Sequence, residues 1–451
     1  MSLTSAVRGQ VWLPGTAGFD TVRRPWNLAI EQPVDAVVEA ADADDVAALV
    51  RYARGAGLTV TTQPNGHGAT GRTAGTVLLR TRRLDSITID PVTRRARLGA
   101  GVASGSLQAA AAPHGLTGLP GSSPVVSVTG VALGGGLSWF GRAHGWVSDS
   151  VLAFDIVDAS GDPRQVTATS DPDLFWALRG GGGDYAVVTG LEMALHPAPH
   201  VYGGRVLWAG EHTAEVVDAF RRIAATAPNE LTVWLELLHF PGADPMVAID
   251  VTHLGSAASH PAASQPTASH PAASQPTASR LAAEARELLA PLDALPAPIS
   301  DSRRIMAVDE LGSITAEPTD PSAGLSHSEF LTDLDDGTVA KLLADPIAPL
   351  LSVQIRHLGG AFAQPSDSPH GPLTEPFALY LFGLADDPAA VLAKQAALAG
   401  SLPVSGRKVF TLLNPRETVA DAFTPETVAR LRAIKQRHDP AGLFRSNFPV
   451  S

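Results

Sequence analysis

Apolar and polar positions follow different patterns in the two halves of the chain. In the first half, Val46, Leu49, Val50 and Ala53 recur at helical spacing, and this stripe predicts a helix over 42–57. Strand-like segments joined by turn residues predict hairpins. Short segments that follow N-cap residues predict short helices. The predicted hairpins are 86–90 with 95–99 and 152–158 with 165–168, and the predicted short helices are 104–112 and 171–178.

Longer strand-like segments dominate the second half. Strands are predicted at 231–239, 246–254, 351–358 and 377–383, and helices at 213–227, 280–289, 388–399 and 425–437. This order favours an antiparallel sheet with helices on one face, and therefore an α+β fold. Strand alternation places Glu236 on the same face as Trp234, and His357 on the same face as Ile355.

A tandem repeat interrupts the second half. Residues 258–277 hold the sequence Ala-Ser-His-Pro-Ala-Ala-Ser-Gln-Pro-Thr twice. Its Pro, Ala and Ser content is typical of a disordered insertion, because such a segment buries little apolar area. His260 and His270 lie ten residues apart without ligand geometry, so no metal site is predicted.

Composition narrows the classes of protein. The chain has 451 residues, 45% of them hydrophobic, and this length favours two or three domains. A net charge of −12 argues against nucleic acid or an anionic membrane surface as a partner, and the absence of cysteine excludes disulfides, iron–sulfur clusters and thiolate zinc sites. No apolar run is long enough to cross a membrane, so we expect a cytoplasmic protein. Many Ala, Gly, Pro and Arg residues are compatible with a bacterial source.

A histidine inside a glycine-rich loop is the first sign of chemistry. His67 lies within 62–71, directly after a strand-like run at 58–62. Glycines let a backbone approach a ligand and present its N–H groups to anionic oxygens, so the loop predicts a phosphate-bearing cofactor beside an imidazole. Gly66, Gly68 and Gly71 also match a dinucleotide fingerprint, but a strand at 77–79 leaves no room for the helix that this motif requires.

Two further glycine-rich stretches lie at 118–145 and 179–189. Any one of them alone is compatible with a simple tight loop. Together with the histidine loop they predict an extended nucleotide cofactor that touches backbone at several places.

The order and spacing of these motifs, with the segment 175–182 and the tail 439–447, resemble FAD-linked oxidases of the vanillyl-alcohol-oxidase superfamily. The chain is most similar to the berberine-bridge-enzyme-like branch, which includes 6-hydroxynicotine oxidases. The resemblance implies an FAD-binding domain at 1–200, a substrate domain at 201–404, and a tail at 405–451 that completes the first domain.

The same resemblance implies an oxidase that takes a hydride from a small organic substrate (an alcohol, amine, sugar or natural-product intermediate) and reduces dioxygen to hydrogen peroxide. A flavin dehydrogenase, a tailoring enzyme that forms a ring or double bond, and a flavin-binding protein without turnover stay open as alternatives. The implied partners are the substrate and oxygen, and the implied assembly is a monomer or homodimer.

By this resemblance His67 is the residue that bonds the flavin. Many relatives form a second bond from a cysteine before a proline, but this chain has Ser123 before Pro124, so one bond is expected. Val126 aligns with the position that controls oxygen access. The remaining implied cofactor contacts are Pro64, Asn65, Gly66, Gly68, Ala69, Thr70, Gly71, Pro120, Gly121, Ser122, Ser127, Gly130, Gly134, Gly135, Gly136, Leu137, Gly183, Val187, Val188 and Asn447.

The catalytic group on the substrate side is less defined by sequence. The segment 354–360 resembles a strand that faces the flavin, and Asp367 falls near the place where some relatives carry a catalytic glutamate. The Tyr-x-Asn-Tyr pattern of many relatives is absent, and 410–414 stands in that region. The candidate catalytic residues are Asp367, Glu375, Tyr380, His357 and Glu236.

Overall fold

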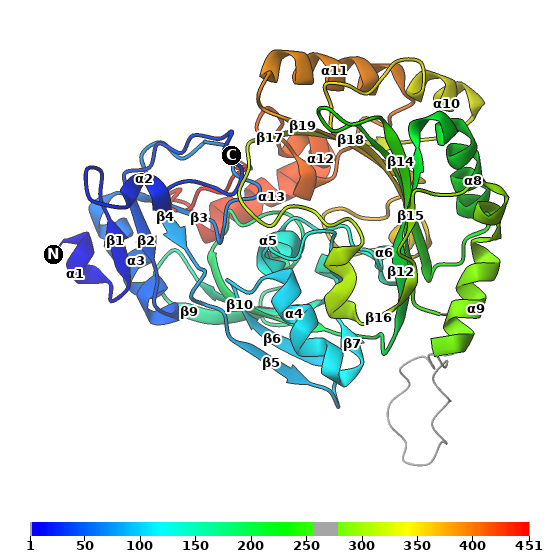
Figure 1. The fold of residues 1–451 in the computed structure, drawn as a ribbon. Helices are drawn as coiled ribbons and strands as arrows, with labels where there is room; N and C mark the ends of the chain where they lie inside the picture. The colour runs from blue at the N-terminus through cyan, green and yellow to red at the C-terminus, as the bar shows by residue number, and fades with distance from the viewer. Residues whose placement is uncertain (1, 256–277, 451) are drawn as a thin grey trace, which may run out of the picture.

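The computed structural model describes residues 2–255 and 278–450, and the predicted insertion at 258–277 lies outside these residues. Figure 1 shows an N-terminal part, coloured blue to cyan, beside a larger part built around one long sheet. The last segment, coloured red, returns to the N-terminal part, where Phe444 forms a β-bridge with Val60. Residues from both ends of the sequence therefore lie together.

A four-stranded sheet begins the chain, with the strand order β1-β2-β4-β3. Its strands are β1 (Gln10–Trp12), β2 (Ala36–Glu39), β3 (Thr59–Thr62) and β4 (Thr76–Arg80). Two short helices, α1 (Leu3–Ala6) and α2 (Phe19–Val22), accompany it. Helix α3 (Ala43–Ala56) begins at Asp42, whose side chain accepts the Asp45 N–H, and ends at Gly57 in the left-handed conformation. The histidine loop follows β3 directly.

A five-stranded antiparallel sheet follows, in the order β5-β6-β10-β8-β9. Its strands are β5 (Ile87–Asp90), β6 (Arg95–Gly99), β8 (Val151–Val157), β9 (Pro163–Thr167) and β10 (Val187–Ala194). The intervening elements are α4 (Ser104–Ala111), α5 (Val128–Leu133), α6 (Gly141–His144), α7 (Pro172–Leu178), and the strands β7 (Leu116–Thr117) and β11 (His196–Pro197), which pair with each other. Both predicted hairpins are present in this sheet.

The second half forms one antiparallel sheet in the order β15-β12-β14-β13-β18-β19-β17, with β16 also paired to β12. Its strands are β12 (Val201–Ala209), β13 (Leu231–Leu238), β14 (Met246–His253), β15 (Ser300–Asp301), β16 (Arg304–Met306), β17 (Gly324–Leu331), β18 (Ser352–His357) and β19 (Phe377–Leu384). Its helices are α8 (Thr213–Thr226), α9 (Ala278–Leu288), α10 (Asp336–Leu342) and α11 (Pro388–Ser401).

The two faces of this sheet differ in chemistry. One face carries aliphatic residues such as Leu235, Ile249 and Ile355, which pack against α8, α9 and α11 in a single apolar core. In Figure 1 these helices lie on the outer side of the sheet, away from the N-terminal part. The inner face carries polar and aromatic side chains, because alternation sends Trp234 and Glu236 to the side opposite Leu235.

The C-terminal segment packs back onto the N-terminal part through α12 (Val419–Ala422) and α13 (Pro425–His438). Lys435 on α13 is buried, and its ammonium donates to the carboxylate of Asp439 at 2.7 Å and to the carbonyl oxygens of Asp184 and Phe444 at 2.5 and 2.7 Å. The buried Asp184 carboxylate in turn accepts the N–H groups of Ser446 and Val450. This network fixes the tail against the glycine-rich stretch at 179–189.

The predicted α+β fold class is confirmed, and every predicted helix or strand among the described residues has a counterpart within two residues at each end. The sequence reasoning missed the long strands β10, β12 and β17. It also missed the shorter strands β1, β2, β7, β11, β15 and β16 and the short helices α1, α2, α5, α6, α10 and α12. No helix in the described part of the chain is long and apolar enough to cross a membrane.

Candidate active site

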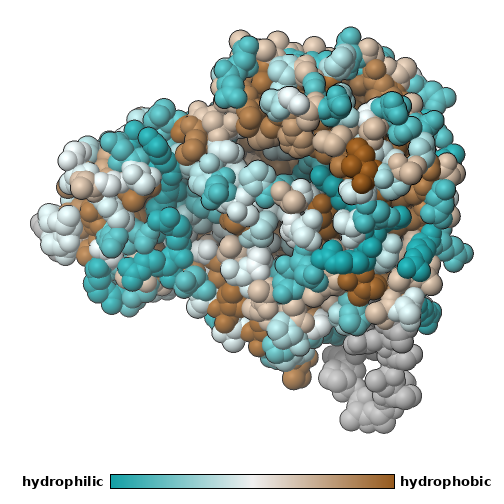
Figure 2. Space-filling model, viewed as in Figure 1, coloured by the Kyte–Doolittle hydropathy of each residue, from teal (hydrophilic) through white to brown (hydrophobic). Residues whose placement is uncertain are grey.

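A cavity of about 840 Å³ lies between the N-terminal sheets and the inner face of the large sheet. Its size is typical of small-molecule and cofactor sites, which have volumes of roughly 300–1,000 Å³. The three glycine-rich stretches line one side, and side chains from β12, β13, β18 and β19 line the other. Figure 2 shows a hollow near the middle of this face of the molecule, bordered by hydrophilic and hydrophobic side chains.

His67 lies on the cavity wall with its ring stacked on Trp26, at a centroid distance of 4.4 Å. Its Nδ1 lies 3.0 Å from Oδ1 of Asn65, and its Nε2 has no hydrogen-bond partner among the described residues. Burial lowers the pKa of His67 to about 4, so the ring is neutral at pH 7. A neutral imidazole with one free nitrogen can act as a nucleophile or as an acceptor.

Asn65 determines which nitrogen of His67 carries the proton. Its side-chain Nδ2 donates to the carbonyl oxygen of Val125 at 2.7 Å, which orients Oδ1 toward His67. Because an amide oxygen only accepts, Nδ1 of His67 must be the protonated nitrogen. The lone pair therefore lies on Nε2, the atom without a partner.

The backbone of the histidine loop offers donors to an anion. The N–H groups of Gly66, His67 and Gly68 have no acceptor among the described residues, and neither do those of Ser122 and Ser123. Consecutive free N–H groups form a concavity that binds phosphate oxygens. Gly66 adopts φ +81°, and a Cβ there would lie 2.8 Å from Pro25, so only glycine fits this turn.

The cavity wall contains sixteen of the residues that the resemblance implied as cofactor contacts. These are Pro64, Asn65, Gly66, His67, Gly68, Gly121, Ser122, Ser123, Val126, Ser127, Gly130, Gly134, Leu137, Gly183, Val188 and Asn447. Seven others do not lie on the wall: Ala69, Thr70, Gly71, Pro120, Gly135, Gly136 and Val187. Several of these shape the loops instead, as when Thr70 donates to the carbonyl oxygen of Asn447 at 3.0 Å.

Five polar side chains, four buried and one half-buried, form a chain of hydrogen bonds across the inner face of the large sheet. Arg205 contacts both oxygens of Asp250, at 2.6 and 2.8 Å, and also hydrogen-bonds Glu236. The other oxygen of Glu236 accepts the amide of Gln354 at 2.6 Å, and the Gln354 oxygen accepts Nε and Nη2 of Arg356 at 3.2 and 2.8 Å. The five side chains therefore form one ordered chain of hydrogen bonds across four strands.

Aromatic rings continue this chain toward the N-terminal part. Trp139 stacks on Trp234 at a centroid distance of 3.6 Å, and the Arg356 guanidinium lies 4.3 Å from the Trp234 ring and 5.4 Å from the Tyr380 ring. Burial raises the pKa of Tyr380, so its hydroxyl stays protonated at neutral pH. Of the five candidate catalytic residues, Glu236 and Tyr380 line the cavity.

The structure does not bring the other three candidates to this cavity. Asp367 is largely exposed and pairs with Arg179 at 2.7 Å. His357 lies 2.9 Å from Arg142, and burial with this neighbouring charge lowers the pKa of His357 to about 3. Glu375 is buried 3.6 Å from Arg407. Each of these side chains is held by an arginine outside the cavity wall.

The sequence reasoning missed Arg205, Asp250, Gln354 and Arg356. For the last three a signal was available, since Asp250 lies in the predicted strand at 246–254, and Gln354 and Arg356 alternate onto one face of the predicted strand at 351–358. Arg205 could not be placed, because its strand was not predicted.

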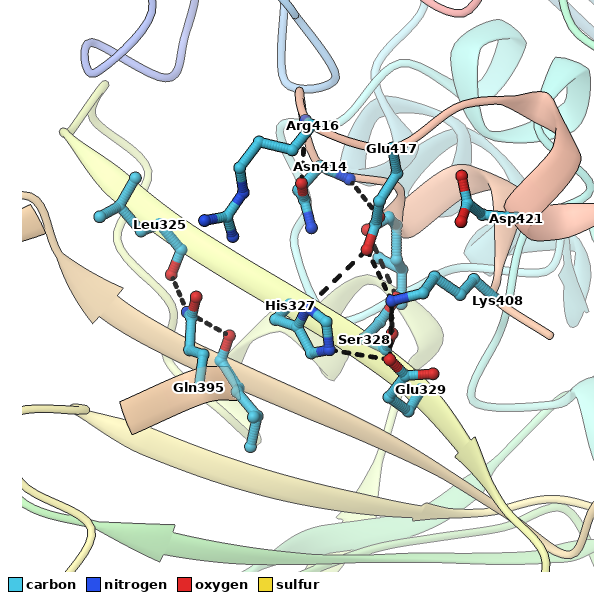
Figure 3. Close-up of polar contacts among 12 residues, drawn as sticks. Leu325, His327, Ser328, Glu329, Gln395, Lys408, Asn414, Arg416, Glu417 and Asp421 are labelled. Carbon is cyan, nitrogen blue, oxygen red and sulfur yellow. Dashed lines mark hydrogen bonds and ion pairs between the residues drawn. The ribbon is translucent and has the colours of Figure 1, made fainter. Parts of the chain in front are cut away.

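A second polar cluster lies outside the cavity and joins β17 to the segment after α11. Figure 3 shows Lys408 between Glu329 and Glu417, at 2.7 Å from each, with His327 2.9 Å from Glu329. All partners in these ion pairs are largely buried, and each charged group is paired. The cluster therefore holds two segments together and offers no free group for a reaction. A small cavity of about 220 Å³ adjoins this cluster and is lined by His327, Leu392, Gln395, Ala396, Asn414, Arg416 and Glu417.

The chain is similar in sequence and in structure to known FAD-binding proteins. A family model described as an FAD binding domain matches residues 34–167. The (R)-6-hydroxynicotine oxidase of Paenarthrobacter nicotinovorans is 29% identical over 478 aligned residues, covering 99% of this chain and 97% of that protein. The crystal structure of 6-hydroxy-D-nicotine oxidase from Arthrobacter nicotinovorans superposes with a TM-score of 0.83 at 26% identity, covering 100% of this chain and 99% of that one.

Berberine bridge enzyme from Eschscholzia californica has the same fold, with a TM-score of 0.78 at 16% identity and coverage of 98% of this chain and 97% of that one. These similarities confirm the resemblance inferred from the sequence. They identify the cofactor as FAD and the enzyme class as oxidoreductase.

The residues on the cavity wall fit this cofactor. The free N–H groups around Gly66 and Ser122 suit the anionic diphosphate, and the free, neutral Nε2 of His67 suits an electrophilic carbon of the ring system. When bound, FAD accepts a hydride from a substrate and returns the electrons to a second acceptor.

Proposed function

We propose that this FAD-dependent oxidoreductase is an oxidase that holds FAD by a single covalent bond at His67. It removes a hydride from a small organic substrate and passes the electrons to dioxygen, giving hydrogen peroxide. The observation that carries the covalent bond is the neutral His67 on the cavity wall, whose enclosed Nε2 has no hydrogen-bond partner among the described residues. Nε2 of His67 would add to the 8α methyl carbon of the flavin once that methyl group has lost a proton, and the two electrons left on the flavin would pass to dioxygen.

The composition of the chain supports one bond rather than two. The chain has no cysteine, and Ser123 occupies the wall position at which many relatives have one. A serine hydroxyl is a far weaker nucleophile than a thiolate at neutral pH. Ser123 therefore contributes its backbone N–H and its small volume, and His67 alone forms the bond.

We assign separate tasks to the two candidate catalytic residues that line the cavity. Both oxygens of Glu236 accept hydrogen bonds from Arg205 and Gln354, so its carboxylate positions these two side chains. The protonated hydroxyl of Tyr380 is available to donate to a polar atom of the substrate. We also propose that the functional division follows the sheets, with FAD bound by 1–200 and 405–451, and substrate by 201–404.

The oxidase proposal is tested by following both products of turnover. Purified enzyme is offered a panel of amines, alcohols and sugars, and oxygen consumption and hydrogen peroxide are measured together. We expect one class to consume oxygen and form peroxide in equal amounts. Substrate-dependent reduction of an artificial dye without peroxide would instead support the dehydrogenase alternative.

Asn65 is expected to affect the rate of flavin attachment. In Asn65→Leu, Nδ1 of His67 loses its acceptor, so the proton can move to Nε2 and block the nucleophilic lone pair. We expect attachment in reconstituted apoprotein to slow by about two- to tenfold, the effect of losing one hydrogen bond worth about 0.5–1.5 kcal/mol. Asn65→Asp keeps an acceptor for Nδ1 but loses the donor to the Val125 carbonyl oxygen, so it should slow attachment less than Asn65→Leu does. Equal slowing in both variants would contradict this role, and acid-stable absorbance over time measures it.

Val126 is expected to control the reaction with oxygen. It lies on the cavity wall, and its carbonyl oxygen accepts the Ser104 N–H at 2.8 Å, which fixes the backbone there. The larger side chain of Val126→Leu should obstruct oxygen and slow reoxidation at least tenfold, with little effect on reduction by substrate. Stopped-flow measurement of both half-reactions tests this. Unchanged reoxidation would mean that oxygen enters elsewhere, and equal slowing of both would mean general damage to the site.

A further inference from the structure

Arg356 is a buried charge without a carboxylate partner. Its residue surface is only 7% exposed, and it lies on the cavity wall at the centre of the large sheet. Among the described residues no carboxylate lies within ion-pair distance of it. Its hydrogen bonds at Nε and Nη2 both go to the neutral amide of Gln354. The guanidinium therefore keeps its full positive charge inside the protein.

The neighbouring carboxylates of Asp250 and Glu236 already accept hydrogen bonds from other side chains. Arg205 binds both oxygens of Asp250 and one oxygen of Glu236, and Gln354 binds the other oxygen of Glu236. Gln354 then separates this group, which holds two carboxylates and one arginine, from Arg356. No carboxylate oxygen therefore contacts Arg356 directly, although the negative charges of Glu236 and Asp250 act on it at longer range.

The surroundings of Arg356 leave one direction open. The Trp234 and Tyr380 rings lie against the guanidinium at 4.3 and 5.4 Å, and Gln354 occupies the edge with Nε and Nη2. The remaining nitrogen, Nη1, makes no hydrogen bond among the described residues, and it is not among the fully enclosed polar atoms. A guanidinium recognises carboxylates in its own plane through such a free edge.

A guanidinium nitrogen that lacks an acceptor on a cavity wall is suited to bind an anionic oxygen of a ligand. On this basis, and resting on the oxidoreductase function above, we propose that Arg356 binds an anionic group of the substrate, and that the substrates of this enzyme are carboxylates. Trp234 and Tyr380 hold the guanidinium in position, while Glu236 keeps Gln354 oriented toward it.

Glu317 is the other charged group to consider on this wall. It lines the cavity but lies beyond ion-pair distance of Arg356. Burial lowers the pKa of Arg356, whereas the negative charge of Glu317 raises it. Glu317 thus helps to keep Arg356 charged, yet leaves its free edge open to a ligand.

Benzoate and its neutral analogue benzamide test the proposal in the holoenzyme. Each is titrated while the visible absorption of the flavin is followed, so no turnover is required. In wild type we expect benzoate to bind at least tenfold more tightly than benzamide. In Arg356→Gln this preference should fall by about ten- to a hundredfold, as expected for losing hydrogen bonds to a charged group. Arg97→Gln, which removes an exposed charge paired with Asp155, should keep the full preference.

Several results would overturn the proposal. Equal binding of benzoate and benzamide in wild type would do so even if Arg356→Gln fails to fold. If the preference for benzoate survives in Arg356→Gln, or in a well-folded Arg356→Ala, then Arg356 does not bind the anion and only packs against the aromatic rings. Peroxide formation without a benzoate preference would refute only the anion site, whereas benzoate preference without peroxide from any carboxylate or other substrate would refute only the oxidase.

Discussion

Replacing His67 by alanine is expected to abolish covalent attachment of FAD completely. Wild-type protein precipitated with acid should stay yellow, and a peptide containing His67 should carry the mass of FAD. In the variant all flavin should appear in the acid supernatant, because the chain has no cysteine to form another bond. Reversible binding should persist, since the free N–H groups near Gly68 and Ser122 are unchanged.

His114→Ala is the matched control for this experiment. His114 is exposed and lies outside the cavity, so this variant should keep its flavin in the acid precipitate. The electron affinity of the flavin should also fall in His67→Ala, measurable as a lower reduction potential. Acid-stable flavin in His67→Ala would show that another residue forms the bond.

The largest effect on stability is expected at Lys435. Replacing it with methionine preserves most of the volume but removes the ammonium that compensates Asp439, which is 2% exposed. The carbonyl oxygens of Asp184 and Phe444 lose their donor at the same time. Removing one partner of a buried ion pair costs about 3–5 kcal/mol in the free energy of unfolding. The thermal midpoint should fall clearly, and flavin release should begin at a lower temperature.

Arg437→Met provides the control on the same helix. Arg437 pairs with Asp173 at 2.7 Å, but its side chain is 58% exposed, and exposed pairs contribute about 1 kcal/mol or less. Its thermal midpoint should stay near that of wild type. A similar fall in both variants would mean that α13 tolerates no change at all, and that the buried network is not the cause.

Local chemistry allowed most helices to be predicted from the sequence. Asp42, Asp387 and Thr424 each accept a backbone N–H at the start of their helix, as their positions in the sequence indicated. Gly57 ends α3 in the left-handed conformation. These signals act over three or four residues, so they can be recognised without knowing the rest of the fold.

Strand β12 shows where such local signals fail. Its two consecutive glycines, Gly203 and Gly204, disfavour a strand by propensity. In the structure Gly204 has φ +146°, and a Cβ there would lie 2.6 Å from the backbone of Arg303. The glycine is present because a distant segment packs closely against the strand. Only the tertiary structure reveals this, and Arg205 was missed with the strand.

The active site was likewise predictable only in part. The histidine loop was recognisable because its glycines, its histidine and its preceding strand are adjacent in sequence. Asp367, His357 and Glu375 were selected by their nearness to family positions, but the structure pairs each with an arginine outside the cavity. Which of these side chains meets which arginine depends on residues more than 30 positions apart, and no local pattern encodes it.

The contact between the histidine loop and the tail bears on synthesis of the protein by the ribosome. Asn447 accepts from Gln63 at 3.0 Å through its side chain and from Thr70 through its carbonyl oxygen. Translation exposes the loop nearly 380 residues before its partner exists. A growing chain that ends before residue 447 has an open wall at this point. We therefore expect the loop to reach its final arrangement around the cofactor only after the tail has been synthesised.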